Sequence, residues 1–185
     1  KQHGKTYFEP IGKALAAAGI KKPNPWNPSH AWALKSVAFP YLKWLIAQRL
    51  LPAAKTQLPS MPAPLARHAE FACQALQAMA TEISGTMGKF QLSLADRQCR
   101  MAELSHRCQN LIVILCTALY GARTQDELVR ESADVLCQEL IQEYTGARPT
   151  NSYFRQVTQL GGAIAAGSFP GLVEITPEEI LMRYD

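Results

Sequence analysis

Apolar residues recur at intervals of three and four along the second half of the chain, a pattern typical of helices that bury one face. The first series begins at Leu65 and covers about six helical turns. Gly85 and Gly88 mark its predicted end, because glycine favours the conformations that terminate helices. The apolar positions of this series are Leu65, Ala69, Ala72, Leu76, Met79, Ile83 and Met87.

Two further helices are predicted to follow. The second extends from Ser93 to Tyr120, with Gly121 as its stop. The third begins at a T-x-x-E capping box, Thr124 with Glu127, and closes at Gly146. The apolar stripe of the second helix is Leu94, Met101, Leu104, Cys108, Leu111, Leu115 and Leu119, and that of the third is Leu128, Ser132, Val135, Leu136, Leu140, Ile141 and Tyr144.

A fourth helix is predicted after its N-cap, Asn151, and it weakens at Gly161-Gly162. Short turns between helices favour antiparallel neighbours, and no strand pattern competes. The sequence therefore predicts an all-α fold, an up-and-down four-helix bundle with an extra N-terminal helical and linker segment. A short helix is also predicted in the tail, with Pro177 at its first position. The apolar positions of the fourth helix are Tyr153, Phe154, Val157, Leu160 and Ile164.

Before the bundle, a short Ala-rich helix is predicted from Ile11 to Ile20. An apolar helix is predicted from His30 to Leu51, with Ser29 as its N-cap and with Pro40 kinking or splitting it. Proline-rich linkers precede and follow this helix. The chain is therefore divided into two parts, a connecting segment with the apolar kinked helix at residues 1–60, and the helical bundle domain and tail at residues 61–185.

The apolar helix is the region that calls for a contact outside the bundle. On a helical wheel, cationic and apolar side chains share one side, so the segment is apolar nearly all round. Two interpretations stay open: packing on the bundle, on a second copy or on a missing domain, and contact with a membrane surface, which Trp and Lys side chains favour. The predicted contact residues are Trp32, Phe39, Lys43 and Trp44, and the shared side holds Trp32, Phe39, Leu42 and Ile46 with Lys35, Lys43 and Arg49.

Composition narrows the classes of function. The 185 residues, 48% of them hydrophobic, suffice for one domain with a core. The formal net charge of +4 is mild and the cations are scattered, so nucleic acid is not an expected partner. The N-terminus shows neither a starting Met nor an apolar signal core, which indicates a piece of a longer chain. The five cysteines form no C-x-x-C pair and are predicted to be reduced core thiols of a cytosolic protein; they are Cys73, Cys99, Cys108, Cys116 and Cys137.

The sequence shows no set of catalytic, cofactor-binding or metal-binding residues. Glu103 and His106 have the Glu-x-x-His spacing of helical di-metal sites, but the spacing occurs once. His106 and Cys108 point to different sides of a helix, so they do not form a nucleophile and base. The glycines Gly161, Gly162 and Gly167 lack the lysine and the strand of a phosphate-binding loop. The chain alone is therefore predicted to be inactive.

Three stretches resemble the C-terminal domain of the very-long-chain type of acyl-CoA dehydrogenases, and the match covers residues 61–170. The first is the entry Met61-Pro62-Ala63-Pro64-Leu65-Ala66 into Ala69-Glu70-Phe71-Ala72-Cys73-Gln74-Ala75-Leu76. The second is Leu94-Ala95-Asp96-Arg97 with Met101-Ala102-Glu103-Leu104 and the apolar run to Tyr120. The third is Tyr153-Phe154-Arg155-Gln156-Val157, with Gly161-Gly162 beyond it.

The resemblance implies a non-catalytic helical domain of a larger FAD-dependent flavoenzyme, an oxidoreductase of fatty-acid β-oxidation. FAD and the catalytic residues would lie in the parent's core, and none of them is carried over to this chain. The implied partners are that core, a second copy as in a dimer, and a membrane surface. The implied location is cytoplasmic and peripheral on the inner membrane. The alternative is a stand-alone helical adaptor that binds a partner helix or a lipid surface, and an orphan enzyme with a site between helices is a third hypothesis.

Overall fold

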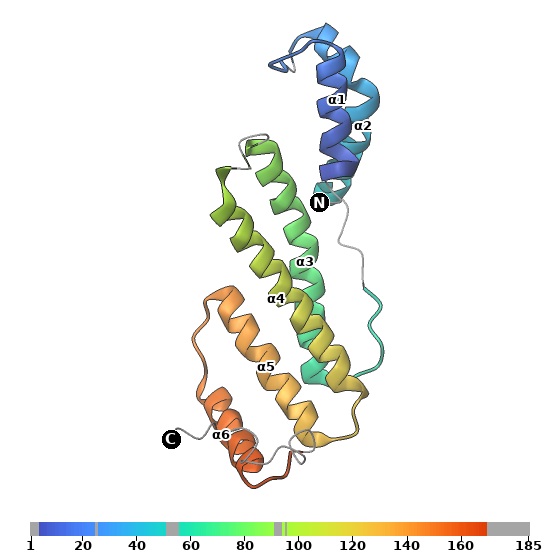
Figure 1. Cartoon of the computed structure of the whole chain (residues 1–185). Coiled ribbons are helices and arrows are strands. Elements are labelled where there is room, and N and C mark those ends of the chain that lie inside the picture. The colour runs from blue at the N-terminus through green and yellow to red at the C-terminus, as the bar shows by residue number, and fades with distance from the viewer. Residues whose placement is uncertain (1–3, 25, 51–55, 91–93, 95, 170–185) are drawn as a thin grey trace, which may run out of the picture. The chain divides into compact units, whose positions relative to one another are not determined.

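The computed structural model describes residues 4–24, 26–50, 56–90, 94 and 96–169. Every regular element in these ranges is helical, which confirms the all-α prediction (Figure 1). The tail helix predicted at Pro177 lies outside the described residues. The elements are a π-helical turn η1 (Gly4–Phe8), α1 (Glu9–Ala17), α2 (Pro28–Leu50), α3 (Ala63–Phe90), α4 (Gln98–Arg123), α5 (Glu127–Thr145) and α6 (Asn151–Ala165).

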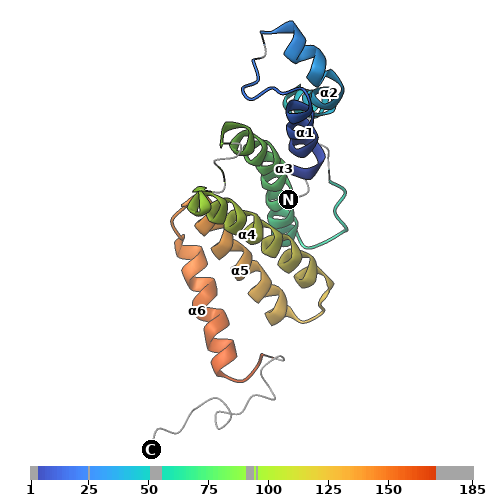
Figure 2. The ribbon, with the colours of Figure 1, turned by 45° about the horizontal axis from the view of Figure 1, so that its top comes forward.

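The chain forms two compact units. The first unit comprises residues 1–55 and 77–99, and the second comprises residues 56–76 and 100–185. The second unit holds the first half of α3 with α4, α5 and α6, and Figure 2 shows the last three helices in succession. Its core is drawn from all four helices and consists of Leu65, Ala69, Ala72, Leu104, Leu111, Ile114, Ala118, Ala133, Cys137 and Leu160.

Contacts within the second unit show how its helices run. Near one end, Gly121 of α4 lies against Leu65 of α3 and Ala133 of α5. One or two turns away, the Cys137 thiol of α5 lies 3.5 Å from the carbonyl oxygen of Ile114 on α4. Because residue numbers rise on α5 as they fall on α4, these two helices are antiparallel.

Gly121 was predicted to end α4, and this prediction is wrong. The residue lies inside the helix, which continues to Arg123. A Cβ atom at this position would lie 2.7 Å from the Cβ of Ala133 and 3.1 Å from Cδ1 of Leu65. The missing side chain is what lets α3, α4 and α5 approach one another here. The glycine therefore serves packing rather than termination.

The capping box predicted at Thr124 and Glu127 is wrong. The N-cap of α5 is Asp126, whose side chain accepts a hydrogen bond of 3.0 Å from the backbone N–H of Val129. Thr124 supports this cap by accepting a hydrogen bond of 3.2 Å from the Asp126 backbone N–H. At the other end, Gly146 terminates α5 as predicted, with a left-handed φ of 71°.

Two other predicted caps are also displaced toward the N-terminus. Thr150, rather than Asn151, caps α6 and accepts a hydrogen bond of 3.2 Å from the backbone N–H of Tyr153. The side chain of Asn27, rather than that of Ser29, accepts a hydrogen bond of 3.1 Å at the start of α2, from the Ser29 backbone N–H. In each case the cap is the residue whose oxygen reaches the free N–H groups of the first turn.

The glycines predicted to end α3 and to weaken α6 lie inside continuous helices. They do not take the positive φ values that would break a helix, whereas Gly167 does, at 73°, just beyond α6. Pro40 likewise does not split α2, which is continuous from Pro28 to Leu50. The glycines that lie inside these continuous helices are Gly85 and Gly88 of α3 and Gly161 and Gly162 of α6.

The predicted apolar stripe is confirmed on α3, where Leu65, Ala69, Ala72 and Met79 are buried. It is partly wrong on the later helices, because small residues occupy the tightest contacts and several large apolar residues lie at the edge. The exposed members of the predicted stripes are Met101, Leu136, Phe154, Val157 and Ile164. The expectation of core thiols holds only for Cys137, since Cys99 and Cys116 are exposed and the other two are half-buried.

Candidate functional site: an apolar face on α2

Helix α2 has an exposed apolar face within the first unit. The side chains on this face follow one another at spacings of seven, three, four and four residues, so they form one stripe about 100° wide on the helix. Trp32 is 72% exposed and Phe39 is 65% exposed, which is unusual for side chains of this size. The stripe, which we call the α2 outer face, consists of Trp32, Phe39, Leu42, Ile46 and Leu50.

The opposite face of α2 is packed. The ring of Tyr41 lies 5.3 Å from that of Phe8 and stacks on that of Trp44 at 5.9 Å. The Tyr41 hydroxyl is 2.8 Å from the hydroxyl of Ser84, a buried residue of α3. Trp44 therefore belongs to the packed side, whereas the predicted contact residues Trp32, Phe39 and Lys43 are exposed.

These two faces explain why the helix looks apolar all round in sequence. One apolar side is satisfied by aromatic packing and by the hydrogen bond between Tyr41 and Ser84. The other side is exposed, from Trp32 to Leu50. Packing within the chain thus accounts for the side around Tyr41, and the outer face is the candidate contact surface.

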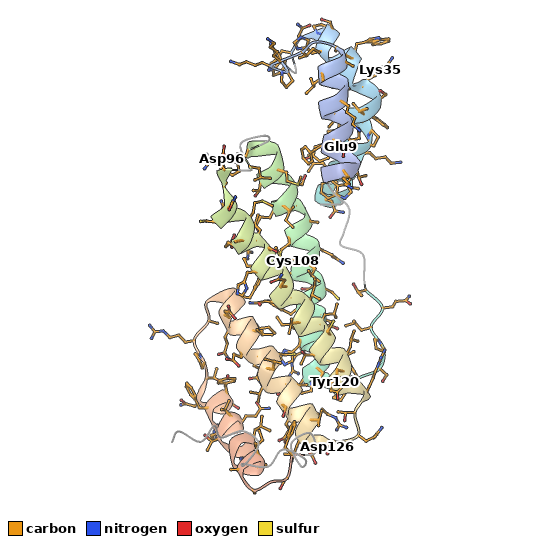
Figure 3. The ribbon with its side chains drawn as sticks, in the orientation of Figure 1. Glu9, Lys35, Asp96, Cys108, Tyr120 and Asp126 are labelled. Atoms are coloured by element: carbon orange, nitrogen blue, oxygen red, sulfur yellow. The ribbon has the colours of Figure 1, made fainter. Side chains whose placement is uncertain are left out.

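Cationic side chains lie beside the apolar residues of the outer face. The Lys35 ammonium is 3.2 Å from the centre of the Trp32 ring, a cation–π arrangement (Figure 3 labels Lys35). Lys43 is exposed, and the side chain of Arg49 lies outside what the structure describes. The sequence from Pro10 to Ala69 contains eight Lys or Arg residues and no Asp or Glu. The interpretation of the cations as scattered overlooked this run of one sign.

A second cluster of polar side chains lies inside the second unit. His68 Nε2 of α3 is 2.7 Å from Asp134 Oδ1 of α5, and both side chains are largely buried. The amides of Gln138 and Gln156 donate to the other carboxylate oxygen at 2.9 and 2.7 Å. Gln138 also donates to Oε1 of Gln156 at 2.9 Å. We call these four side chains the Asp134 network.

The Asp134 network links α3, α5 and α6 by hydrogen bonds, which is a structural role. Burial pushes the pKa of the Asp134 carboxyl upward, but hydrogen bonds from His68, Gln156 and Gln138 outweigh it, so the pKa lies below its ordinary value. No hydroxyl or thiol in the described part of the chain hydrogen-bonds to His68. The pairing of imidazole and carboxylate thus lacks the nucleophile that a catalytic triad requires.

The predicted Glu-x-x-His pair is divided between separate partners. Glu103 accepts a hydrogen bond of 3.3 Å from Arg107, whose guanidinium also donates to the Tyr144 hydroxyl at 3.2 Å. His106 instead lies 3.0 Å from a carboxylate oxygen of Glu143 on α5. Across the ranges that the structure describes, no three His, Cys, Asp or Glu side chains gather as metal ligands.

Within the described residues, no helix combines the length and the apolar character needed to cross a bilayer. Comparisons with known protein families, with curated proteins and with solved structures found no match for this chain.

Proposed function

We propose that this chain is a non-catalytic helical domain of a larger acyl-CoA dehydrogenase-like flavoenzyme of fatty-acid β-oxidation, and that α2 docks it on the inner membrane from the cytoplasmic side. The resemblance over residues 61–170 supports the parentage. The observation that carries the docking role is the α2 outer face, where exposed Trp32 and Phe39 lie among cations.

The chemistry of this face suits an anionic lipid surface. Aromatic rings favour the headgroup level, and aliphatic side chains of a helix lying in the interface bury themselves at the boundary with the acyl chains. Lys35 and Lys43 can extend their ammonium groups toward lipid phosphates, and each cation near such a surface contributes about 1 kcal/mol. The absence of acidic residues from Pro10 to Ala69 removes the repulsion that would oppose this contact.

Two features support a role without chemistry of its own. The largely buried pair His68 and Asp134 is engaged in contacts that join helices, and Arg107 pairs with Glu103 along α4. The groove between α4 and α5 is lined by apolar and hydroxyl side chains without a cation, which does not fit the pyrophosphate of FAD. In this proposal FAD stays in the parent's core, and the second unit packs on that core and supports a dimer.

Vesicle flotation tests the docking role. The chain is mixed with vesicles of phosphatidylcholine alone or with added phosphatidylglycerol, and the floating fraction is measured. We expect binding to the anionic vesicles that weakens with salt. The double variant Trp32→Ala/Phe39→Ala should lower the partition coefficient by about tenfold or more, from the apolar burial it loses. Tyr120→Ala, which removes a comparably exposed aromatic ring from the second unit, should not. Equal flotation of the parent chain and both variants would contradict the proposal that α2 binds the membrane.

Flavin binding tests the non-catalytic role. The chain is incubated with FAD, separated from free flavin by gel filtration, and examined for the visible absorption of protein-bound flavin. We expect none to co-elute. A stoichiometric flavin spectrum would contradict the proposal, because the cofactor would then be held by these residues themselves.

The second candidate is a stand-alone adaptor that binds a partner helix. The positions Phe39, Leu42 and Ile46 have the i, i+3, i+7 spacing with which helices anchor in grooves, and this favours it. The coding sequence upstream of Lys1 distinguishes the flavoenzyme domain from the stand-alone adaptor. A flavoprotein core encoded there supports the domain, and its absence supports the adaptor.

A further inference from the structure

The connection between α1 and α2 lies in the first unit and presents an exposed tryptophan between lysines and the start of α2. The two helices pack side by side, so this connection forms the tip of a helical hairpin (Figure 1). Trp26 is 90% exposed, and Lys21 and Lys22 are exposed as well. We call residues 20–24, 26 and 27 the tip loop.

Hydrogen bonds within the chain fix the backbone around Trp26. The Asn24 side chain accepts a hydrogen bond of 3.0 Å from the Trp26 backbone N–H, and the Asn24 carbonyl accepts one of 3.1 Å from the Asn27 N–H. The backbone N–H of Asn24 in turn donates to Nδ1 of His30 at 3.2 Å. The backbone donors of Trp26 and its neighbours are thus satisfied internally, which favours their entry into the boundary of an apolar phase.

The cations of the chain are concentrated in the first unit. Residues 1–55 and 77–99 contain eleven Lys or Arg and three Asp or Glu, a formal net charge of +8. The second unit contains eight Lys or Arg and twelve Asp or Glu, a formal net charge of −4. An anionic surface therefore attracts the first unit and repels the second. Its complementarity to the tip loop is both electrostatic and chemical, because a tryptophan ring favours the headgroup level and lysines suit lipid phosphates.

We propose that the tip loop is a second contact of the chain with an anionic lipid bilayer, in which Trp26 lies at the headgroup level and Lys21 and Lys22 bind lipid phosphates. The inference rests on the proposed docking role of α2 and adds a separate contact to it. Trp32 and Lys35 belong to the first turns of α2, so the tip loop continues directly into the α2 outer face. The N-terminal end of α2 is thus the end that is anchored at the bilayer.

Fluorescence quenching by brominated lipids tests the position of Trp26 in the full chain. The variant Trp32→Phe/Trp44→Phe keeps Trp26 as its only tryptophan, since the chain has three. It is mixed with vesicles of phosphatidylcholine and phosphatidylglycerol, with or without bromine on the acyl chains. We expect the Trp26 emission to shift to shorter wavelength on binding and to be quenched by the brominated lipids. The control Trp26→Phe/Trp32→Phe keeps Trp44, which stacks on Tyr41, and should bind without quenching.

Flotation of charge variants tests the two lysines. Lys21→Gln/Lys22→Gln should lower the partition coefficient on the vesicles with phosphatidylglycerol by about tenfold, because two cations near the anionic surface are lost. Arg148→Gln/Arg155→Gln removes the same charge from exposed positions of the second unit and should change the coefficient by less than about twofold.

Three results would overturn the inference. The first is a parent chain that does not float with anionic vesicles, which would contradict the docking role of α2 and the tip-loop contact together. The second is flotation of the parent chain with unquenched Trp26 emission, which would contradict the tip-loop contact and leave the docking by α2 standing. The third is equal weakening by the two charge variants, which would show attraction by net charge alone.

Discussion

Nε2 of His68 lies 2.7 Å from Oδ1 of Asp134, and this contact joins α3 to α5 inside the second unit. The remaining carboxylate oxygen accepts from two glutamine amides, one of them on α6. A largely buried carboxylate is thus surrounded by donors from three helices. Because such donors lose their partner when the acceptor is removed, the contact leads to a sharp expectation for stability.

Asp134→Ala should destabilise the chain by about 2 kcal/mol, because it leaves the donors of His68 and Gln156 without this acceptor in a poorly hydrated site, while Gln138 keeps only Gln156 as an acceptor. The measurement is the urea midpoint at neutral pH, followed by circular dichroism. Glu139→Ala is the control, since that residue is exposed on the same helix. Equal midpoints for the two variants would show that the network does not stabilise the fold.

The same carboxyl predicts a dependence on pH. Its pKa is lower in the folded chain than its ordinary value of about 3.9, so the folded state binds the proton more weakly than the unfolded state. The stability that Asp134 contributes is therefore complete above that ordinary value and is lost as the pH falls through the folded-state pKa. The stability gap between the parent and Asp134→Asn should narrow as the pH falls from about 5 to 2. A gap that stays constant over this range would contradict the assignment.

Gly121→Ala should destabilise the second unit by about 1–3 kcal/mol, because its new methyl group would overlap Ala133 and Leu65. Gly161→Ala is the matched control on a neighbouring helix, where an added Cβ would meet no atom within 4 Å. That change should be neutral or stabilising by about 0.5–1 kcal/mol. Thermal unfolding of the two variants compares them directly, and the opposite order of stability would refute the close-packing role of Gly121.

The positions of the helices could be predicted because apolar spacing reports a buried face, as it does for Leu65, Ala69 and Met79 on α3. The tightest contacts could not be predicted, because Gly121 and Ala133 have too little apolar side chain to appear in a pattern of hydrophobic spacing.

The polar contacts escaped prediction for a different reason. His68 and Asp134 are 66 residues apart, and a pairing across that separation leaves no local pattern in the sequence. On α2, one stripe could not be told from two, because the packed side around Tyr41 is as apolar as the outer side around Phe39. Only the neighbours in three dimensions distinguish them.

The contact between Tyr41 and Ser84 predicts a non-additive pair. Tyr41→Phe should cost about 1–2 kcal/mol, because it leaves the buried Ser84 hydroxyl without this partner. Tyr41→Phe/Ser84→Ala should recover part of that loss, since both polar groups are then absent. Urea unfolding of the two single variants and the double variant completes the cycle. Strictly additive effects would show that the two hydroxyls do not interact.

The N-cap of α5 gives a prediction that separates Asp126 from Glu127. Asp126→Ala removes the oxygen that accepts from the Val129 N–H and should cost about 1 kcal/mol. Glu127→Ala should cost only a few tenths of a kcal/mol, because Glu127 is the exposed first residue of the helix and contributes through the helix dipole alone. A capping box built on Thr124 would instead make Glu127 and Thr124 sensitive and Asp126 tolerant. Unfolding midpoints of the three alanine variants distinguish the two arrangements, because each predicts a different ranking of the same residues.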